Sequence, residues 1–393
     1  MKALLVTPPL TQLNTPYPAT CHLLGFLHSR NHNAEQMDLG IELIGRLFTG
    51  TMLKRIFEVA SQHSRLSKAN RIILQQADFY IRTIDPVMRF LGGKDATLAQ
   101  RFCELTFWPE SKRLPSDEDL EWGFGLIGNY DRATHLCTLF LKDLCDFINS
   151  TIDPHFELIR YAESLCLRLP EFRPLQNELQ KPHTLIDTLM LDIFSQRMAL
   201  CKPDLVGFSV PFPGNLYSAL RCAQWIRQNF PQVKIVMGGG YVNTELRSLT
   251  DPALFDFIDY PVFDDGELPL LRIMDGGELI RTLYRDDAGA IIRLNFDSKE
   301  NIPFAESGTP SYEGLLQNNY INMIELTNPM HALWSNGKWN KLMLAHGCYW
   351  GKCAFCDGAL DYVKRFDQAP VELIVDRIEA VIAQTGQTGF HFV

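Results

Sequence analysis

"PDLVGFSVPFPGNLYSALRCAQWIRQNFPQVKIVMGGGY", residues 203–241, is the stretch that decides the fold class. It opens with a continuous apolar run that ends in a Pro/Gly loop, continues with apolar residues at helical spacing, and closes with a second apolar run before three glycines. Continuous apolar runs are typical of strands that are buried on both faces of a sheet. A strand, a helix and a strand in this order predict two parallel strands joined by a crossover helix.

The same pattern flanks this stretch on both sides. Residues 2–9, "KALLVTPP", are predicted to form a buried strand, residues 20–33 a helix, and residues 34–40 a second strand. Residues 253–277 add a short helix, a strand, a loop at 264–267 and another helix. Strands that alternate with helices predict the α/β class, here a doubly wound, flavodoxin-like domain with a parallel sheet.

A long helical segment separates the first two strands from the rest. A simple crossover needs far fewer residues, so we expect a large helical insertion, about 41–200, within a domain of residues 1–275. The apolar residues along one side of its helices indicate packing of the helices against each other rather than a ligand site. The alternative is that the insertion forms a lid over the carboxyl edge of the sheet. Residues 276–340 are predicted to form a hairpin, at 279–295, and an irregular linker, after which residues 341–393 begin a further domain.

Composition and charge narrow the class of protein. The chain has 393 residues, of which 46% are hydrophobic and 21% are charged, as in globular proteins. Its formal net charge of −9 argues against nucleic acid and anionic membrane surfaces as partners. No apolar run approaches the ~18 residues of a membrane span, and Met1 leads into a strand rather than an export signal. We therefore expect a cytoplasmic protein with reduced thiols.

Three of the ten cysteines form a cluster, whereas the others are scattered singly among apolar neighbours. "AHGCYWGKCAFCDG", residues 345–358, contains Cys348, Cys353 and Cys356 with C-x4-C-x2-C spacing. Structural zinc takes four protein ligands, and His346 is the local candidate for a fourth, although its place at a strand end explains it as well. A 4Fe-4S cluster takes four cysteines, so three would leave one iron open for a small molecule. The flanking order of strand, loop and helix favours an iron–sulfur cluster. Zinc remains the alternative.

The cysteine loop lies inside a further β/α pattern. Residues 341–348 predict a strand that runs into the loop, and residues 370–386 predict a helix with Pro370 at its start. Residues 389–393 then predict the start of another strand. A strand, a loop, a helix and a strand are the beginning of a domain rather than a whole one.

The segment "GCYWGKCAFCDG", residues 347–358, resembles the cluster loop of the radical S-adenosylmethionine (SAM) superfamily. In that family three cysteines hold a 4Fe-4S cluster, SAM chelates the fourth iron, and reductive cleavage of SAM yields a 5′-deoxyadenosyl radical. The resemblance implies that Cys348, Cys353 and Cys356 ligate the cluster and that Phe355 packs near the adenine of SAM. The usual family spacing is C-x3-C-x2-C, so the first gap here is one residue longer. Gly347 and the "YWGK" inside that gap resemble the cobalamin-binding branch of the superfamily.

That branch carries an N-terminal doubly wound domain, and ligands of such sheets bind at the carboxyl ends of the strands. The stretches "PPL", "DLVGFSVPFP", "VKIVMGGGYV" and "DDGELPLL" resemble the cobalamin-binding loops of the branch, with Asp265 in place of the family's first glycine. A tight strand-to-helix turn would also explain the three glycines without any ligand. The residues that the resemblance assigns to cobalamin are Thr7, Pro8, Pro9, Ser209, Val210, Pro211, Gly238, Gly239, Gly240, Gly266 and Glu267.

The resemblance implies a cobalamin-dependent methyltransferase that acts on an unactivated carbon by radical chemistry. The D-x-H-x-x-G motif, whose histidine coordinates cobalt in other cobalamin domains, is absent from the sequence, so cobalamin would be held without a histidine on cobalt. Residues 341–393 supply only the first unit of the family's (β/α)6 partial barrel, so we expect the chain alone to turn over poorly. The expected partners are a small-molecule or peptide substrate, an external electron donor and a second chain that carries the rest of the barrel. The alternative is a non-catalytic cobalamin- or metal-binding module, including a zinc-stabilised interaction protein.

Overall fold

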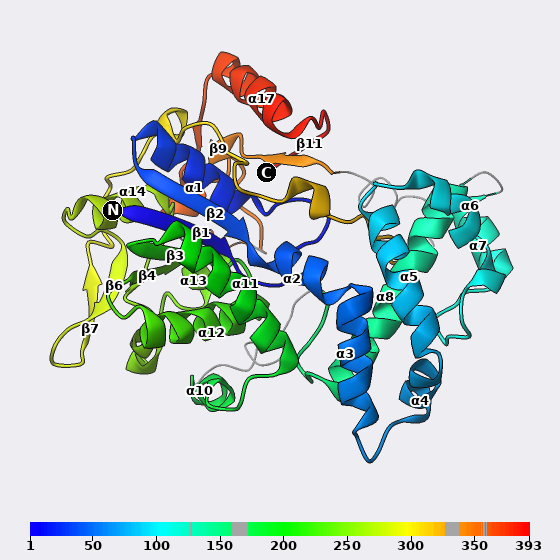
Figure 1. Cartoon of the computed structure of the whole chain (residues 1–393). Helices are drawn as coiled ribbons and strands as arrows, with labels where there is room; N and C mark the ends of the chain where they lie inside the picture. The colour runs from blue at the N-terminus through cyan, green and yellow to red at the C-terminus, as the bar shows by residue number, and fades with distance from the viewer. Residues whose placement is uncertain (126–127, 159–171, 327–337, 355, 357, 359) are drawn as a thin grey trace.

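A parallel sheet of five strands organises the chain from residue 2 to residue 261 (Figure 1). The computed structural model describes residues 1–125, 128–158, 172–326, 338–354, 356, 358 and 360–393. The strands are β1 (Lys2–Thr7), β2 (Asn33–Asp38), β3 (Leu205–Ser209), β4 (Lys234–Gly238) and β5 (Tyr260–Pro261). They lie in the order β2-β1-β3-β4-β5, and every neighbouring pair is parallel. The predicted α/β class with a parallel sheet is confirmed, and this order reverses its direction of winding between β1 and β3.

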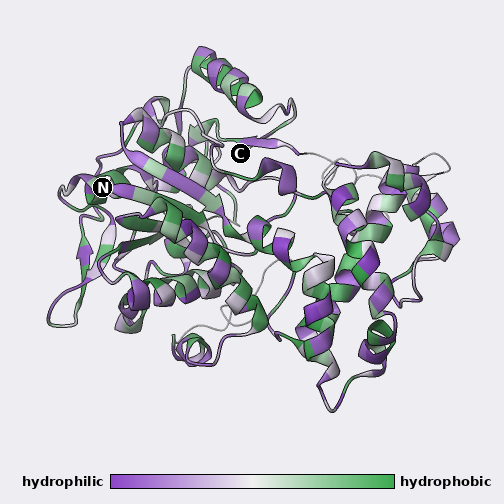
Figure 2. Ribbon diagram, viewed as in Figure 1, coloured by the Kyte–Doolittle hydropathy of each residue, from purple (hydrophilic) through white to green (hydrophobic). Residues whose placement is uncertain are grey.

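Both faces of the sheet are buried, because alternate side chains of a strand point to opposite sides. Leu4 and Val6 of β1 belong to one apolar cluster, and Ala3 and Leu5 belong to another. The helices α1 (Pro18–Ser29) and α14 (Glu267–Asp275) pack on the face of Ala3 and Leu5, and α11 (Leu185–Cys201) and α12 (Gly214–Asn229) pack on the opposite face. In Figure 2 these helices alternate between apolar and polar residues, as expected for helices that present one side to a sheet.

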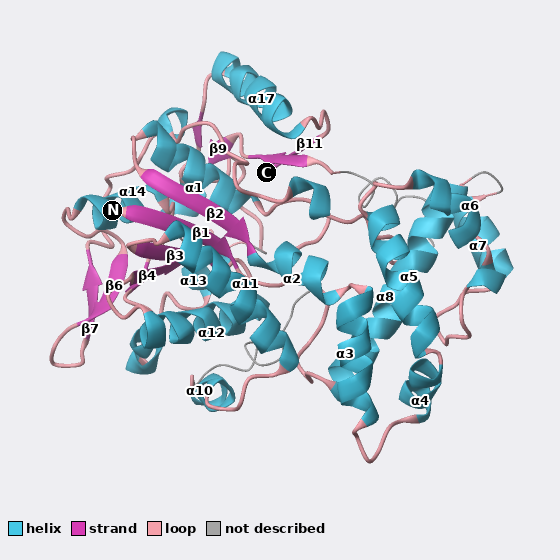
Figure 3. Cartoon of the chain, viewed as in Figure 1, coloured by secondary structure: helices cyan, strands magenta, loops and turns pink. Residues whose placement is uncertain are grey.

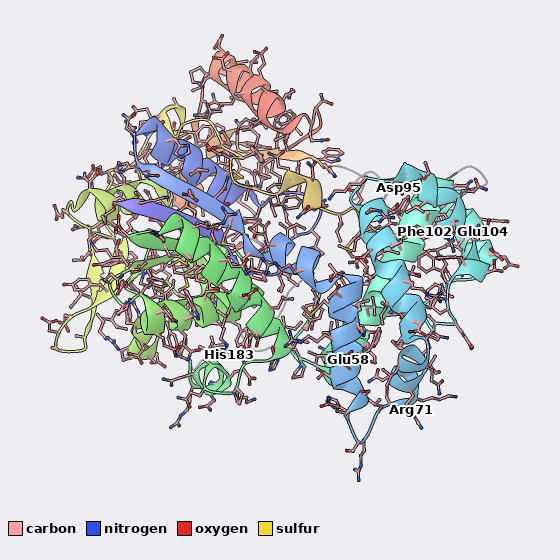
Figure 4. All side chains as sticks on the ribbon, in the orientation of Figure 1. Glu58, Arg71, Asp95, Phe102, Glu104 and His183 are labelled. Atoms are coloured by element: carbon pink, nitrogen blue, oxygen red, sulfur yellow. The ribbon has the colours of Figure 1, made fainter. Side chains whose placement is uncertain are left out.

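The predicted helical insertion lies between β2 and β3, and much of it extends away from the sheet as a separate lobe (Figure 3). Its helices are α2 (Leu39–Leu47), α3 (Gly50–Ser61), α4 (Lys68–Gln75), α5 (Ala77–Leu91), α6 (Ala99–Phe102), α7 (Asp117–Phe124), α8 (Asn129–Thr151), α10 (Arg173–Leu179) and α11. Aromatic rings fill the lobe. The ring of Tyr80 stacks on that of Phe140 with centroids 4.9 Å apart. The buried Phe102 of α6, labelled in Figure 4, belongs to the same lobe. Among the described residues, no helix is both long and apolar enough to cross a membrane.

The part of the chain that follows α14 begins with the predicted antiparallel hairpin, which is formed by β6 (Thr282–Arg285) and β7 (Ile291–Leu294). The C-terminal unit that follows the linker contains β8 (Asn340–Leu342), β9 (Ala345–His346), α16 (Asp361–Lys364), β10 (Asp367–Gln368), α17 (Val371–Thr385) and β11 (Phe390–Phe392). The parallel pair of β8 and β11, joined through α17, forms a β/α unit. The domain boundaries at 275 and 340 remain predictions.

The single strand predicted over residues 341–348 is wrong. It divides into β8 and β9, because β8 pairs in parallel with β11, whereas β9 pairs antiparallel with β10. Met343 and Leu344 connect the two short strands. The cysteine loop therefore follows β9 rather than a strand of the parallel pair.

Candidate functional site

A cavity of about 450 Å³ lies where the strand ends of the sheet meet the cysteine-bearing segment. One side is formed by α1, by the end of β3 and by the loops that follow β4 and β5. The other side is formed by Met343, by residues 345–348 and by Tyr362 and Val363. Because parallel strands end at the same edge of a sheet, their loops supply one common wall. The volume is in the range of sites that take drug-sized ligands.

The structure brings some of the residues assigned to cobalamin to this cavity. Those that line it are Ser209, Gly238, Gly239, Gly240, Gly266 and Glu267. Those that are not among its lining residues are Thr7, Pro8, Pro9, Val210 and Pro211. The backbone of Pro8 is engaged elsewhere, because its carbonyl accepts a hydrogen bond of 2.9 Å from Asn215 Nδ2. The backbone N–H of Val210 likewise donates to the carbonyl of Gly238 at 2.7 Å.

The glycines after β4 are required by the turn itself. Gly239 has a φ of 112°, in the region that favours glycine, and a Cβ there would lie 2.7 Å from the carbonyl oxygen of Val210. A Cβ on Gly240 would lie 3.0 Å from the carbonyl oxygen of Pro211. The close approach of the β3 and β4 loops thus explains these two glycines without a ligand. Their backbone nevertheless forms part of the cavity wall.

A buried ion pair joins the two sides of the cavity. Glu267, in the first turn of α14, places its Oε1 3.4 Å from Nε2 of His346 on β9. Burial raises the pKa of the Glu267 carboxyl, but the adjacent imidazole outweighs it and the net shift of that pKa is downward. Burial lowers the pKa of His346, but the Glu267 carboxylate and then Asp265 outweigh it, and the net shift is upward. Both shifts favour a charged pair.

A second ion pair crosses the same joint. Arg365 contacts the carboxylate of Asp265, whose Oδ2 also lies 3.8 Å from Nδ1 of His346. Burial raises the pKa of Asp265 to about 6, although the cationic neighbours His346 and Arg365 oppose this shift. Asp265 therefore serves to hold the C-terminal unit on the sheet.

Besides His346, whose ring nitrogens face the carboxylates of Asp265 and Glu267 without a hydrogen bond, two buried polar side chains in the cavity wall lack a partner for one polar atom. Nδ1 of His22 and Oγ of Ser209 are sealed from solvent and have no hydrogen-bond partner among the described residues. Both residues line the cavity. Ser209 was predicted from its place at a strand end. His22 was missed, because its only sequence signal is a polar residue within the apolar pattern of α1.

The first cysteine of the motif also lines the cavity. The backbone N–H of Cys348 donates to the carbonyl of Val363 at 3.0 Å, which fixes the start of the loop. Backbone N–H groups at Gly351 and then Trp350 lower the pKa of the Cys348 thiol, because they stabilise the thiolate. Cys353 and Cys356 are exposed, and all three are free thiols.

The three thiols do not converge in the structure. In the described part of the chain, no three His, Cys, Asp or Glu side chains lie close enough to hold a metal ion. His346 is directed at two carboxylates, Glu267 and Asp265, rather than at the cysteines as a fourth zinc ligand would be. Phe355, which the resemblance places near the adenine of SAM, lies outside the described residues.

Comparisons with known proteins give a sparse result. No protein-family model and no curated protein matches the chain. Among solved structures, the chain is similar to the radical S-adenosylmethionine methyltransferase TsrM from Kitasatospora setae with tryptophan substrate and a SAM analogue bound. The TM-score is 0.34 and the sequence identity is 18%, and the match covers 52% of this chain and 39% of that chain. For TsrM with cobalamin and a 4Fe-4S cluster bound, the TM-score is 0.32 and the identity 18%, over 53% of this chain and 40% of that chain. The chain thus spans about two fifths of the length of these structures, and at these TM-scores we draw no function from the likeness.

Proposed function

We propose that this chain is a cobalamin-binding radical SAM iron–sulfur protein of the methyltransferase type. The observation that carries the proposal is the shared cavity, which Cys348 lines together with Ser209 and Glu267. The cysteine motif and the strand-end loops were assigned to different cofactors from separate parts of the sequence. Their meeting at one cavity is what a reaction between two cofactors requires, because reacting groups must be held close together.

The cysteine loop supplies donors of the right chemistry for an iron–sulfur cluster. Thiolates are the form in which sulfur binds metal, and the lowered pKa of Cys348 favours that form. Cys353 and Cys356 are free and exposed, so they can be drawn toward a cluster. Metal binding commonly orders its own ligands, so the loop would fold around the cluster as it assembles.

The sheet side of the cavity supplies groups for a bulky ligand with many acceptors. Ser209 Oγ and His22 Nδ1 are buried polar atoms without partners among the described residues, and a ligand rich in carboxamide and phosphate oxygens would satisfy them. The ion pair of Glu267 with His346 holds the cysteine segment at a fixed distance from these groups. When bound, cobalamin would supply methyl transfer and SAM on the cluster would supply radical chemistry. A corrinoid is larger than the cavity, so part of it would occupy the mouth.

A non-catalytic cobalamin- or metal-binding module is the second candidate. It is favoured by the absence, in the described residues, of a preformed three-ligand site. Zinc as a structural ion would need a fourth ligand, and the engagement of His346 with Glu267 argues against the nearest one.

Anaerobic reconstitution with ferrous iron and sulfide tests the proposal. We expect about four iron atoms and four acid-labile sulfides per chain, together with an electron paramagnetic resonance signal of the reduced cluster that changes on addition of SAM. Cobalamin should remain with the protein through gel filtration. One zinc per chain without sulfide would sink the radical SAM assignment, and failure to retain cobalamin would remove the corrinoid part.

Serine variants provide matched controls. Cys348→Ser, Cys353→Ser and Cys356→Ser should each lose the cluster, because each removes one ligand. Cys103→Ser, at a partly exposed thiol in the helical lobe, should keep the full iron content.

A further inference from the structure

His22 was not assigned any role by the sequence, and its position in α1 places it in the wall of the cavity. Its side chain is almost fully buried, with a relative exposure of 4%. The neighbouring apolar residues Leu24, Phe26 and Leu27 pack on the sheet, so the helix fixes where the ring lies. Buried imidazoles in native proteins normally have partners for both nitrogens.

The protonation state of His22 follows from its neighbours. Nε2 lies 3.5 Å from the backbone nitrogen of Met343, and a backbone N–H can only donate, so Nε2 accepts. Burial lowers the pKa of His22 to about 4, against the opposing effect of the Glu267 carboxylate, so the ring is neutral at pH 7. A neutral ring whose Nε2 accepts must carry its proton on Nδ1.

The Nδ1–H group is therefore a buried donor, and it finds no acceptor among the residues that the structure describes. Leaving a buried donor without a partner is energetically unfavourable. Ser209, in the same cavity wall, has a hydroxyl in the same condition. Two unpartnered donors around one cavity indicate a ligand that brings acceptors to them.

We infer that His22 is a ligand-binding residue of this cavity, whose Nδ1–H donates a hydrogen bond to a carboxamide or phosphate oxygen of the bound corrinoid. The inference rests on the proposed function and adds a specific contact to it. Because Nδ1 carries the proton and Nε2 faces Met343, the ring does not coordinate cobalt. His22 also connects the ligand to the cysteine segment, because Met343 lies between β8 and β9.

Two substitutions of similar size separate the two ring nitrogens. An asparagine amide can occupy the position of Nδ1 and donate, so His22→Asn should bind cobalamin within about threefold of the wild type. A glutamine oxygen can replace Nε2 as the acceptor for Met343, but His22→Gln has no donor at the Nδ1 position and should bind about tenfold more weakly. The measurement is cobalamin affinity by equilibrium dialysis on the full chain, with thermal unfolding of the unliganded variants as the check that both fold.

The outcomes distinguish this inference from the function on which it rests. Equal affinity of both variants and the wild type would overturn the role of His22 and leave cobalamin binding intact. A wild type that binds no cobalamin would overturn the proposed function and this inference with it. Nuclear magnetic resonance of the ¹⁵N-histidine-labelled protein gives a readout without ligand, because an Nε2–H tautomer of His22 would contradict the assignment. A further readout is the electron paramagnetic resonance signal of cobalt in the bound cobalamin. A splitting of that signal that depends on ¹⁵N-histidine, and that both variants lose, would show that His22 coordinates cobalt and would overturn the inference.

Discussion

Glu267 and His346 lie 3.4 Å apart, Oε1 to Nε2, and their ion pair joins the first turn of α14 to β9. The two side chains are 6% and 3% exposed, so water screens their attraction little. One residue belongs to the sheet domain and the other to the segment that carries the cysteines. The contact therefore sets the separation of the two walls of the candidate site.

Glu267→Gln should weaken this joint. The amide keeps the shape of the side chain but leaves Nε2 of the buried His346 without its carboxylate, so that only Asp265, at 3.8 Å from Nδ1, remains. We expect the free energy of unfolding to fall by about 1–3 kcal/mol, as measured by urea denaturation. Glu245→Gln, at an exposed residue after α13, should change it by less than about 0.5 kcal/mol. Equal effects of the two substitutions would show that the pair does not hold the joint.

Gly347→Ala should disturb the start of the cysteine loop. Gly347 has a φ of 72°, and a Cβ there would lie 1.5 Å from the carbonyl oxygen of Arg365. The pairing of β9 with β10 must therefore open to admit the methyl group. Gly386→Ala is the matched control, because Gly386 has a φ of 68° and nothing within 4 Å of a Cβ.

The Gly386 variant separates two effects of the Gly347 substitution. Both variants carry the strain of an alanine at positive φ, but only Gly347→Ala also brings a methyl group against the carbonyl oxygen of Arg365. Gly386→Ala should cost about 1 kcal/mol of unfolding free energy, and Gly347→Ala at least about 2 kcal/mol more. The same Gly347 variant should retain less iron after reconstitution, because Cys348 directly follows it. If the two variants unfold at the same urea concentration, the tight approach of Arg365 is not a feature of the folded protein.

The elements of the sheet could be predicted because their signals are local and continuous. The apolar runs of β1, β3 and β4 and the helical spacing of α12 each lie within one short stretch. The break between β8 and β9 could not be predicted in this way. The pairing of Ala345 and His346 with Gln368 and Asp367 joins two-residue strands across the cysteine loop, and strands so short carry no periodicity.

The composition of the candidate site depends on contacts between distant residues. The end of β1 was expected at the cavity, but Pro8 is bonded to Asn215, which lies far along the chain. Nε2 of His22 lies 3.5 Å from the backbone nitrogen of Met343, 321 residues away. No window of sequence contains both members of such a pair, so strand ends identify the edge of the sheet but not which of its residues face the cavity.

A buried ion pair should contribute, beside the apolar packing of α11, to the attachment of the helical insertion to the sheet domain. Arg221 Nη2 of α12 lies 3.3 Å from Asp187 Oδ2 of α11, with side chains 2% and 0% exposed. Asp187→Ala leaves the buried guanidinium with neutral hydrogen-bond partners, such as the carbonyl of Leu179, but without a carboxylate, and should cost about 3–5 kcal/mol in urea unfolding. Asp192, also on α11, forms an ion pair with Arg46 of α2, and the two side chains are 54% and 44% exposed. Asp192→Ala should therefore cost at most about 1 kcal/mol. A similar small cost for both would mean that the buried pair does not anchor α11.

The stability of the chain should depend on pH through Asp38, at the start of the insertion. Its carboxylate accepts hydrogen bonds from the backbone N–H of Ile41 at 3.1 Å and from Tyr320 at 2.8 Å. Burial outweighs both bonds and raises the pKa of Asp38 from 3.8 to about 6. Because the folded state holds this proton more tightly than the unfolded state, the contribution is full below about pH 4 and is lost as pH rises through about 6. The shift of about two units corresponds to about 3 kcal/mol.

Asp38→Asn tests this sign directly, because an amide cannot titrate. Its oxygen can keep the hydrogen bond from Ile41, and its NH2 group, in the place of Oδ2, can donate to the Tyr320 hydroxyl. The difference in unfolding free energy, variant minus wild type, should grow by up to about 3 kcal/mol between pH 4 and pH 7 in urea titrations. Tyr320→Phe removes a hydrogen bond that favours the ionised carboxylate, so it should move the same transition to higher pH. If the unfolding free energies of Asp38→Asn and the wild type depended on pH in the same way, the raised pKa of Asp38 would be contradicted. Other buried groups do not affect this test, because both proteins contain them.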